Sequence, residues 1–69
     1  MKKNIWYAVI PANEDNPDWG WGSTRKRDAI RMARQWTRDE GRAYDVAVID
    51  TATDDHFCTA VIEVGSKAE

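Results

Sequence analysis

Apolar residues gather in three short runs along the chain, each rich in the β-branched and aromatic residues that strands favour. These runs cover residues 5–11, 43–50 and 56–64. The stretch 12–23, which follows the first run, is rich in Asn, Asp, Gly and Pro and therefore indicates a loop. Within that loop, the Trp-Gly-Trp-Gly sequence of residues 19–22 has a second interpretation, as a short extra strand paired with the first.

Residues 24–40 show the period of an amphipathic helix instead. With 100° of rotation per residue, one arc of about 160° holds the apolar face. It comprises Ala29, Ile30, Met32, Ala33, Trp36 and Thr37. Ser23 or Thr24 is expected to cap the helix, because a side-chain oxygen there can accept from the free N–H groups of the first turn. Gly41 is expected to end it, since glycine adopts the left-handed conformation at low cost.

The element order β-α-β-β predicts one α+β domain over residues 1–69, with a polar tail at 65–69. We expect a three-stranded, mainly antiparallel sheet with one helix packed on one face and a right-handed connection through the helix. The run at 56–64 is the most continuously apolar, which favours a central position and the spatial order 1-3-2. The helix is expected to cover Val46, Val48, Cys58, Ala60 and Ile62.

Opposite its apolar face, the helix carries a row of four arginines. Arg27, Arg31, Arg34 and Arg38 fall in an arc about 60° wide and about 16 Å long. The chain as a whole has a net charge of -2. Like charges four residues apart cost a few tenths of a kcal/mol, so helix stability does not explain the row. It is interpreted either as a solvated outer face or as a docking surface for nucleic-acid phosphate or an acidic protein patch.

One helix can cover only one face of the sheet. Strand alternation places Trp6, Ala47, Ile49, Phe57, Thr59 and Val61 on the other face. Trp6, Ile49, Phe57 and Val61 are the candidate sheet-face interface. The loop could fold beneath the sheet and place Trp19 and Trp21 there. Otherwise a second copy or a foreign protein covers it, and an exposed Trp19 or Trp21 would anchor a partner, because tryptophan is enriched at binding hot spots.

The composition offers little for catalysis or metal binding. Cys58 is the only cysteine, which excludes an internal disulfide, and a single histidine, His56, leaves too few ligands for a structural zinc site. Asp54, Asp55 and His56 are adjacent, with no second cluster to complete a metal site, and Cys58 is expected to be a small core residue. No apolar run approaches the ~20 residues of a membrane span. We therefore expect a cytoplasmic protein with no enzyme activity, metal, cofactor, small-molecule substrate or membrane contact.

The chain as a whole resembles the small accessory proteins encoded by phages and other mobile elements, including anti-CRISPR proteins. The likeness rests on a length of 69 residues, a compact sheet with one helix, absent catalytic groups and polarised charge. It implies action by binding to a host complex and assigns no role to any single residue. A second likeness, to short bacterial proteins with the pattern "T…AI..AR…EG", covers only a capped amphipathic helix and implies no function.

Three functions remain open from the sequence. The first is a non-catalytic protein-binding module, an inhibitor that docks on a host nucleoprotein complex through charged and aromatic surfaces. Its binding residues would be Arg27, Arg31, Arg34, Arg38, Trp19 and Trp21. The second is a nucleic-acid binder using the same arginines, and the third is a structural homodimer without a ligand. The net charge of -2 favours a protein partner, because nonspecific nucleic-acid binders usually carry a net basic domain.

Overall fold

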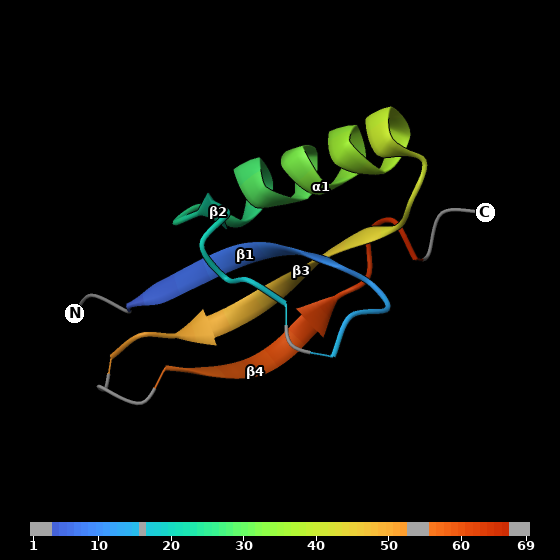
Figure 1. Cartoon of the computed structure of the whole chain (residues 1–69). Helices are drawn as coiled ribbons and strands as arrows, with labels where there is room; N and C mark the ends of the chain where they lie inside the picture. Colours follow the sequence, from blue (N-terminus) through green and yellow to red (C-terminus); the bar gives the residue numbers. More distant parts are fainter. Residues whose placement is uncertain (1–3, 16, 53–55, 67–69) are drawn as a thin grey trace.

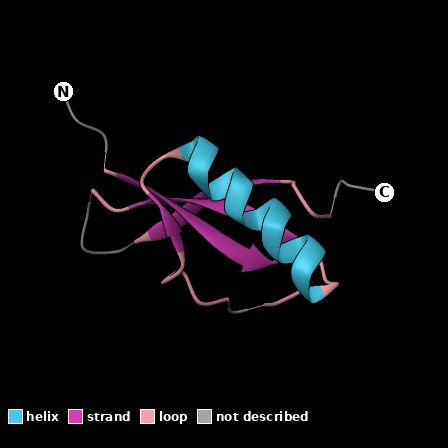
Figure 2. Ribbon diagram, turned by 90° about the horizontal axis from the view of Figure 1, so that it is seen from above, coloured by secondary structure: helices cyan, strands magenta, loops and turns pink. Residues whose placement is uncertain are grey.

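The computed structural model describes residues 4–15, 17–52 and 56–66. Within these residues, five elements follow one another: β1 (Ile5–Pro11), β2 (Gly22–Ser23), α1 (Lys26–Glu40), β3 (Tyr44–Asp50) and β4 (Phe57–Ile62). The strands form one antiparallel sheet with the spatial order β2-β1-β3-β4, and α1 lies across one of its faces (Figure 1, Figure 2). The predicted α+β class is confirmed, as is the packing of the predicted helix on one face of the sheet.

The number and order of the strands differ from the sequence prediction. Residues 44–50, rather than 56–64, occupy the centre, because β3 pairs with β1 on one side and with β4 on the other. The predicted order 1-3-2 is therefore wrong, and the rule of right-handed connections, which concerns parallel strands, does not apply to β1 and β3. The loop after β1 returns the chain alongside β1 before α1 begins, so β1 and β3 run antiparallel and pair directly.

Asp45 shows how an interrupted apolar run can occupy the centre of the sheet. This residue is only 5% exposed. Its Oδ1 accepts hydrogen bonds from the backbone N–H of Val64 (2.9 Å), the backbone N–H of Ser66 (3.1 Å) and the Ser66 hydroxyl (3.0 Å). A buried carboxylate is tolerated when such donors replace water. Asp45 thereby fixes the segment that follows β4.

The short strand β2 agrees with the second interpretation of the tryptophan-rich loop in pairing with the first strand, but it covers Gly22–Ser23 rather than residues 19–22. Tyr7 pairs with Ser23 and Ala8 pairs with Gly22, and the N–H of Val9 donates to the carbonyl of Trp21 at 2.7 Å. Glycine is required where the two strands approach: a Cβ on Gly22 would meet the carbonyl oxygen of Tyr7 and lie 2.9 Å from the Cα of Ala8.

The two ends of α1 differ in how well the sequence predicts them. The helix begins at Lys26 after Arg25, which makes no side-chain cap. The Ser23 hydroxyl accepts from the N–H of Arg25 at 3.1 Å, one residue ahead of the helix, so neither Ser23 nor Thr24 is the predicted cap. The prediction for Gly41 is confirmed, because it has a φ of 70° and its N–H donates to the carbonyl of Thr37.

The core has two layers, one on each face of the sheet. On the helix side, the buried residues are Val9, Ala29, Ala33, Tyr44 and Val46. On the far side they are Ala8, Ile10, Ala47 and Ile49, with Trp6 and Trp19 packed against them. The indole N–H of Trp6 donates to the carbonyl of Trp19 at 2.7 Å, which ties the loop to the far face. The loop is thus the cover that this face was expected to need.

A bulge in β4 overturns the predicted positions of two side chains. Val48 pairs with Ala60 but Ile49 pairs with Cys58, so Thr59 is an extra residue, and its hydroxyl donates to the carbonyl of Val48 at 3.2 Å. Cys58 therefore shares the far face with Ile49, and Phe57 shares the helix side with Asp50. The expectation that α1 would cover Cys58 is wrong, because the cysteine is also exposed.

Candidate partner-binding surfaces

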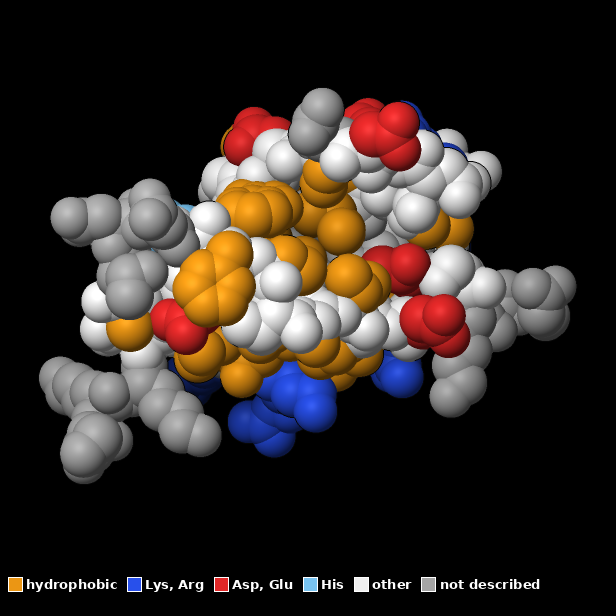
Figure 3. Space-filling view, turned by 90° about the horizontal axis from the view of Figure 1, so that it is seen from below, with side chains coloured by type: hydrophobic (Ala, Val, Ile, Leu, Met, Phe, Trp, Pro, Cys, Tyr) orange, Lys and Arg blue, Asp and Glu red, His pale blue; other side chains and the backbone are white. Residues whose placement is uncertain are grey.

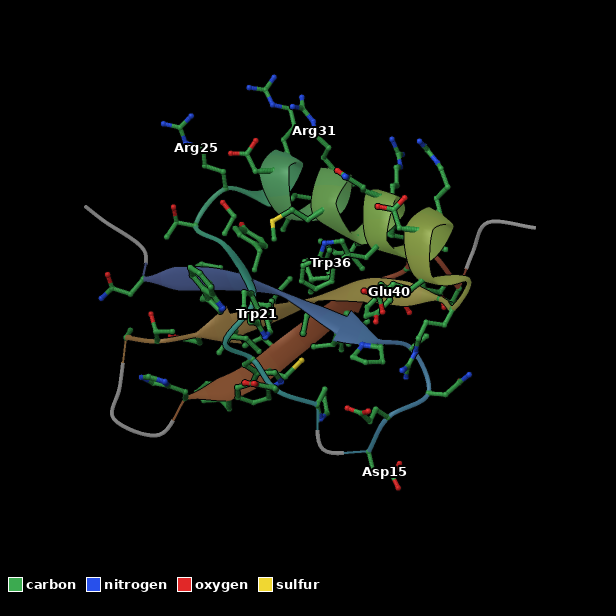
Figure 4. The ribbon with its side chains drawn as sticks, turned by 45° about the horizontal axis from the view of Figure 1, so that its top comes forward. Asp15, Trp21, Arg25, Arg31, Trp36 and Glu40 are labelled. Atoms are coloured by element: carbon green, nitrogen blue, oxygen red, sulfur yellow. The ribbon has the colours of Figure 1, made fainter. Side chains whose placement is uncertain are left out.

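The arginine row lies on the outer surface of α1, as the sequence predicts. Arg27, Arg31, Arg34 and Arg38 are all exposed. Figure 4 shows the labelled Arg31 projecting away from the sheet, whereas the labelled Trp36 on the same helix points toward it. In the described parts of the chain, the side-chain hydrogen bonds use none of these four guanidinium groups. Their donors are therefore available to an anionic partner.

The two flanks of the row differ in charge. At 100° per residue, Asp28 and Asp39 lie together on one flank, about 100° from the centre of the row. The opposite flank carries Lys26, Ile30 and Thr37 and has no carboxylate in the helix sequence. The positive charge of the row is thus balanced on one side only.

The uncompensated flank borders β4, which is the least covered strand of the sheet. The backbone of α1 approaches β1, β2 and β3 closely but not β4, whose Ile62 reaches the helix-side core with its side chain. All six residues of β4 are exposed or half-buried, including Phe57 at 48% and Val61 at 51%. Phe57 and Val61 lie on opposite faces of β4, so each face of this strand exposes a large apolar side chain.

A groove runs between α1 and the end of β4, with a volume of about 730 Å³. Lys26, Arg34 and Arg38 form its basic side, whereas Ile30, Ile62 and Val64 supply apolar lining. Glu63 is its one acidic lining residue among the described parts of the chain. Figure 3, which views the molecule from the side of β4, shows apolar side chains across the middle and Lys and Arg side chains at the lower margin.

The outer edge of β4 carries unpaired backbone groups, and the hydrogen bonds of the neighbouring strands show which ones. The N–H of Ala12 donates to Ala43 and the N–H of Thr51 donates to Asn4, so the odd-numbered residues of β3 face β1. The even-numbered residues therefore face β4. Since Val46 and Val48 pair with Ile62 and Ala60, those two residues of β4 face inward.

Val61 lies between them in the strand, so its N–H and C=O point away from the sheet. β4 therefore combines unpaired backbone groups on its outer edge with exposed apolar side chains.

The two loop tryptophans occupy different faces, so the alternative that placed both beneath the sheet holds for Trp19 but not for Trp21. Trp19 is half-buried on the far side, whereas Trp21 is 63% exposed on the helix side. The Trp21 ring meets Trp36 edge to face at a centroid distance of 6.3 Å, and Trp36 meets Tyr44 in the same way at 5.5 Å. Of the two, Trp21 is the one available to a partner.

The predicted sheet-face interface does not form one surface. Ile49 is 1% exposed and Trp6 is half-buried against the loop, so neither is free for a partner. Val61 lies on the same face and is exposed, while the bulge moves Phe57 to the helix side. The two exposed members of the set both belong to β4 but lie on opposite faces of it.

The structure also shows where the residues considered for catalysis or metal binding lie. Cys58 and His56 are exposed, and within residues 4–15, 17–52 and 56–66 no three His, Cys, Asp or Glu side chains gather as metal ligands would. Asp54 and Asp55 lie outside the described residues. In the described part of the chain, no helix has the length and apolar character needed to cross a bilayer.

One pair of residues at the end of α1 was not anticipated from the sequence. The Tyr44 hydroxyl donates to Oε1 of Glu40 at 2.6 Å. This hydrogen bond raises the pKa of Tyr44, as do burial and the negative charge of Glu40, because all three disfavour the phenolate. The guanidinium carbon of Arg42 lies 5.6 Å from the centroid of the Tyr44 ring, and its positive charge lowers the pKa of Tyr44. The pair fastens the end of α1 to the start of β3.

Comparison of this chain with protein-family models, with curated protein sequences and with solved structures finds no match.

Proposed function

We propose that this chain is a non-catalytic protein-binding module that docks on an acidic surface of a partner through the arginine row of α1. The observation that carries the proposal is the exposure of four guanidinium groups on one helix face, outside the intramolecular side-chain hydrogen bonds of the described residues. Arginine forms forked hydrogen bonds with carboxylates, and complementary charge steers association and fixes orientation. Exposed Trp21 supplies a second, aromatic contact.

In the context of the resemblance to phage-encoded accessory proteins, the partner is a subunit of a cytoplasmic host nucleoprotein complex. Binding there inhibits the complex by covering the surface that it needs. The proposal requires no cofactor and no reacting group, because stoichiometric binding is sufficient.

Charge reversal tests the proposal. The tagged chain is used as bait in a lysate of its native host after nuclease treatment, in wild-type form and as the Arg31→Glu/Arg34→Glu double variant. The matched control is Arg25→Glu, an exposed arginine that precedes the first residue of α1 and lies outside the row. We expect the wild type and the control to retain the same protein at one-to-one stoichiometry and the double variant to lose it. Retention of that protein by the double variant at the wild-type level contradicts the proposal.

Nucleic-acid binding is the second candidate, and the same exposed row favours it because phosphates also accept forked hydrogen bonds from arginine. Asp28 and Asp39 beside the row, together with the net charge of -2, oppose it. Nucleic-acid binding would weaken steeply with salt, since neutralising phosphates releases counterions. A gel-shift assay at low salt that retards neither DNA nor RNA excludes it.

A further inference from the structure

We propose that the groove between α1 and β4 binds an extended acidic segment of the partner, which joins the sheet as an added strand on the outer edge of β4. This inference rests on the proposed protein-binding function and names the kind of segment that the chain recognises. Addition of a peptide strand to an exposed sheet edge is a recurrent mode of recognition, in which backbone hydrogen bonds supply affinity and alternate side chains supply specificity.

The edge of β4 has few of the features that keep monomeric sheets from pairing. Its six residues, Phe-Cys-Thr-Ala-Val-Ile, include no charge and no proline, although edge strands are usually protected by such residues. The bulge at Thr59 is one protective feature, but beyond it Ala60, Val61 and Ile62 continue in regular register with β3. The outward-pointing N–H and C=O of Val61 lie in this regular part, where an added strand would bond to them.

The geometry of an added strand determines its side chains. Such a strand would run about 4.8 Å beyond β4, with successive side chains pointing to opposite faces of the sheet. Side chains on the helix side would lie beside Ala60 and Ile62, in the direction of the basic wall of the groove. Those on the other side would lie beside exposed Val61. The structure thus favours a segment in which acidic residues alternate with small or apolar ones.

Charge distinguishes this occupant from a second copy of the chain. Lys26, Arg34 and Arg38 line the groove against one carboxylate, that of Glu63. If β4 paired antiparallel with β4 of a second copy, both helices would lie on the same face of the joined sheet. The helix-side residues that the second copy would bring are Phe57, Ala60 and Ile62, which are uncharged. The basic wall would then have no counter-charge, whereas an acidic segment supplies it.

Titration of the ¹⁵N-labelled chain with two defined peptides tests the inference. One is the acetylated and amidated peptide Gly-Glu-Val-Glu-Val-Glu-Val-Gly, and the other has lysine in place of each glutamate. We expect the glutamate peptide to bind at least tenfold more tightly than the lysine peptide. The backbone amide of Val61 should shift and become protected from exchange. Val61→Pro, which removes the outward N–H, should weaken binding at least tenfold, while Val61→Thr keeps both the N–H and the branched shape and should bind as the wild type does.

N-methylation of alternate residues of the glutamate peptide tests the same edge without a protein variant. Of the two alternating sets of residues that can be methylated, the set whose N-methyl groups face β4 should abolish binding. Several results overturn the inference: no binding at 1 mM, equal binding of both peptides, or shifts confined to α1 with Val61 unchanged. Concentration-dependent sedimentation of the free chain, with Val61 already protected, would show a second copy on the edge and also overturn it. None of these results removes the arginine row from the proposed function, which the Arg31→Glu/Arg34→Glu comparison tests separately.

Discussion

Val61 and Ala47 lie directly opposite each other in the sheet, yet Ala47 is fully buried and Val61 is 51% exposed. The difference arises because Trp19 packs on the far side of β1 and β3, whereas all six residues of β4 are exposed or half-buried. The sheet therefore has a covered centre and an uncovered outer strand. That strand lies beside the basic flank of α1, and this combination underlies the proposed mode of binding.

The arginine row should contribute nothing to stability. Replacing Arg31 by alanine removes like-charge neighbours at i-4 and i+3 and introduces the best helix former, without disturbing any buried contact. We expect the free energy of unfolding, measured by urea denaturation, to change by less than about 0.5 kcal/mol. A loss of about 2 kcal/mol or more would show instead that the row has a structural role.

Asp45 should be important for stability because three donors depend on its carboxylate. In Asp45→Ala the N–H groups of Val64 and Ser66 lose their acceptor in a part-buried site, and each unsatisfied donor costs about 1–3 kcal/mol. The control is Asp18→Ala, which removes one exposed bond to the N–H of Gly20 and should cost under about 1 kcal/mol. Equal losses for the two variants in urea denaturation would contradict the anchoring role of Asp45.

Gly65 should tolerate no side chain. A Cβ at this buried position would meet the Thr37 hydroxyl and lie 2.6 Å from the backbone nitrogen of Tyr44, which belongs to the central strand and cannot move freely. We expect Gly65→Ala to destabilise the chain by about 1–3 kcal/mol through overpacking. Gly41→Ala provides a contrast, since a Cβ there meets nothing within 4 Å and the cost of about 1–2 kcal/mol comes from its positive φ alone.

A crystal structure of Gly65→Ala should show displacement of Thr37, whereas Gly41→Ala should leave it in place. If Gly65→Ala left both the position of Thr37 and the free energy of unfolding unchanged, this would contradict the close approach of Gly65 to β3.

The hydrogen bond between Tyr44 and Glu40 predicts a dependence of stability on alkaline pH. The pKa of Tyr44 is raised above its ordinary value of 10.0, chiefly by that bond, so the folded state holds the phenolic proton more tightly than the unfolded state does. The resulting stabilisation is complete below pH 10 and is lost as the pH rises through the folded-state pKa.

Thermal unfolding between pH 9 and pH 11.5 should therefore show a steeper alkaline loss of stability for the wild type than for Tyr44→Phe. Glu40→Gln should reduce the difference, because it removes the charged acceptor that causes the shift. Parallel curves for the wild type and Tyr44→Phe would contradict this assignment.

Local patterns predicted several elements well, because their signals lie within a few residues of one another. The apolar period placed α1 and its outward arginines, and Gly41 marked the end of the helix through its backbone conformation. β1 covers the predicted run at 5–11, since Pro11 bounds it. The exposed positions of the arginine row follow directly from the helical period.

The arrangement of the strands depended on contacts that local patterns do not record. Burial of Asp45 relies on donors about twenty residues away, so the interrupted run at 44–50 did not look central. The bulge at Thr59 reverses the faces of Phe57 and Cys58, and nothing in the strand sequence marks its position. The absence of charge in residues 57–62 was the signal that could have identified an open edge, but the same feature favours a buried strand.

The most direct test of this account measures amide hydrogen exchange along β4 in the free, monomeric chain. The central claim is that β4 has an open outer edge beside the basic flank of α1. It predicts that the amide of Val61 exchanges at close to its intrinsic rate, while the amides of Ala60 and Ile62, which face β3, are protected by at least two orders of magnitude. Protection of Val61 together with rapid exchange at Ala60 and Ile62 would contradict the register, the open edge and the binding mode built on them.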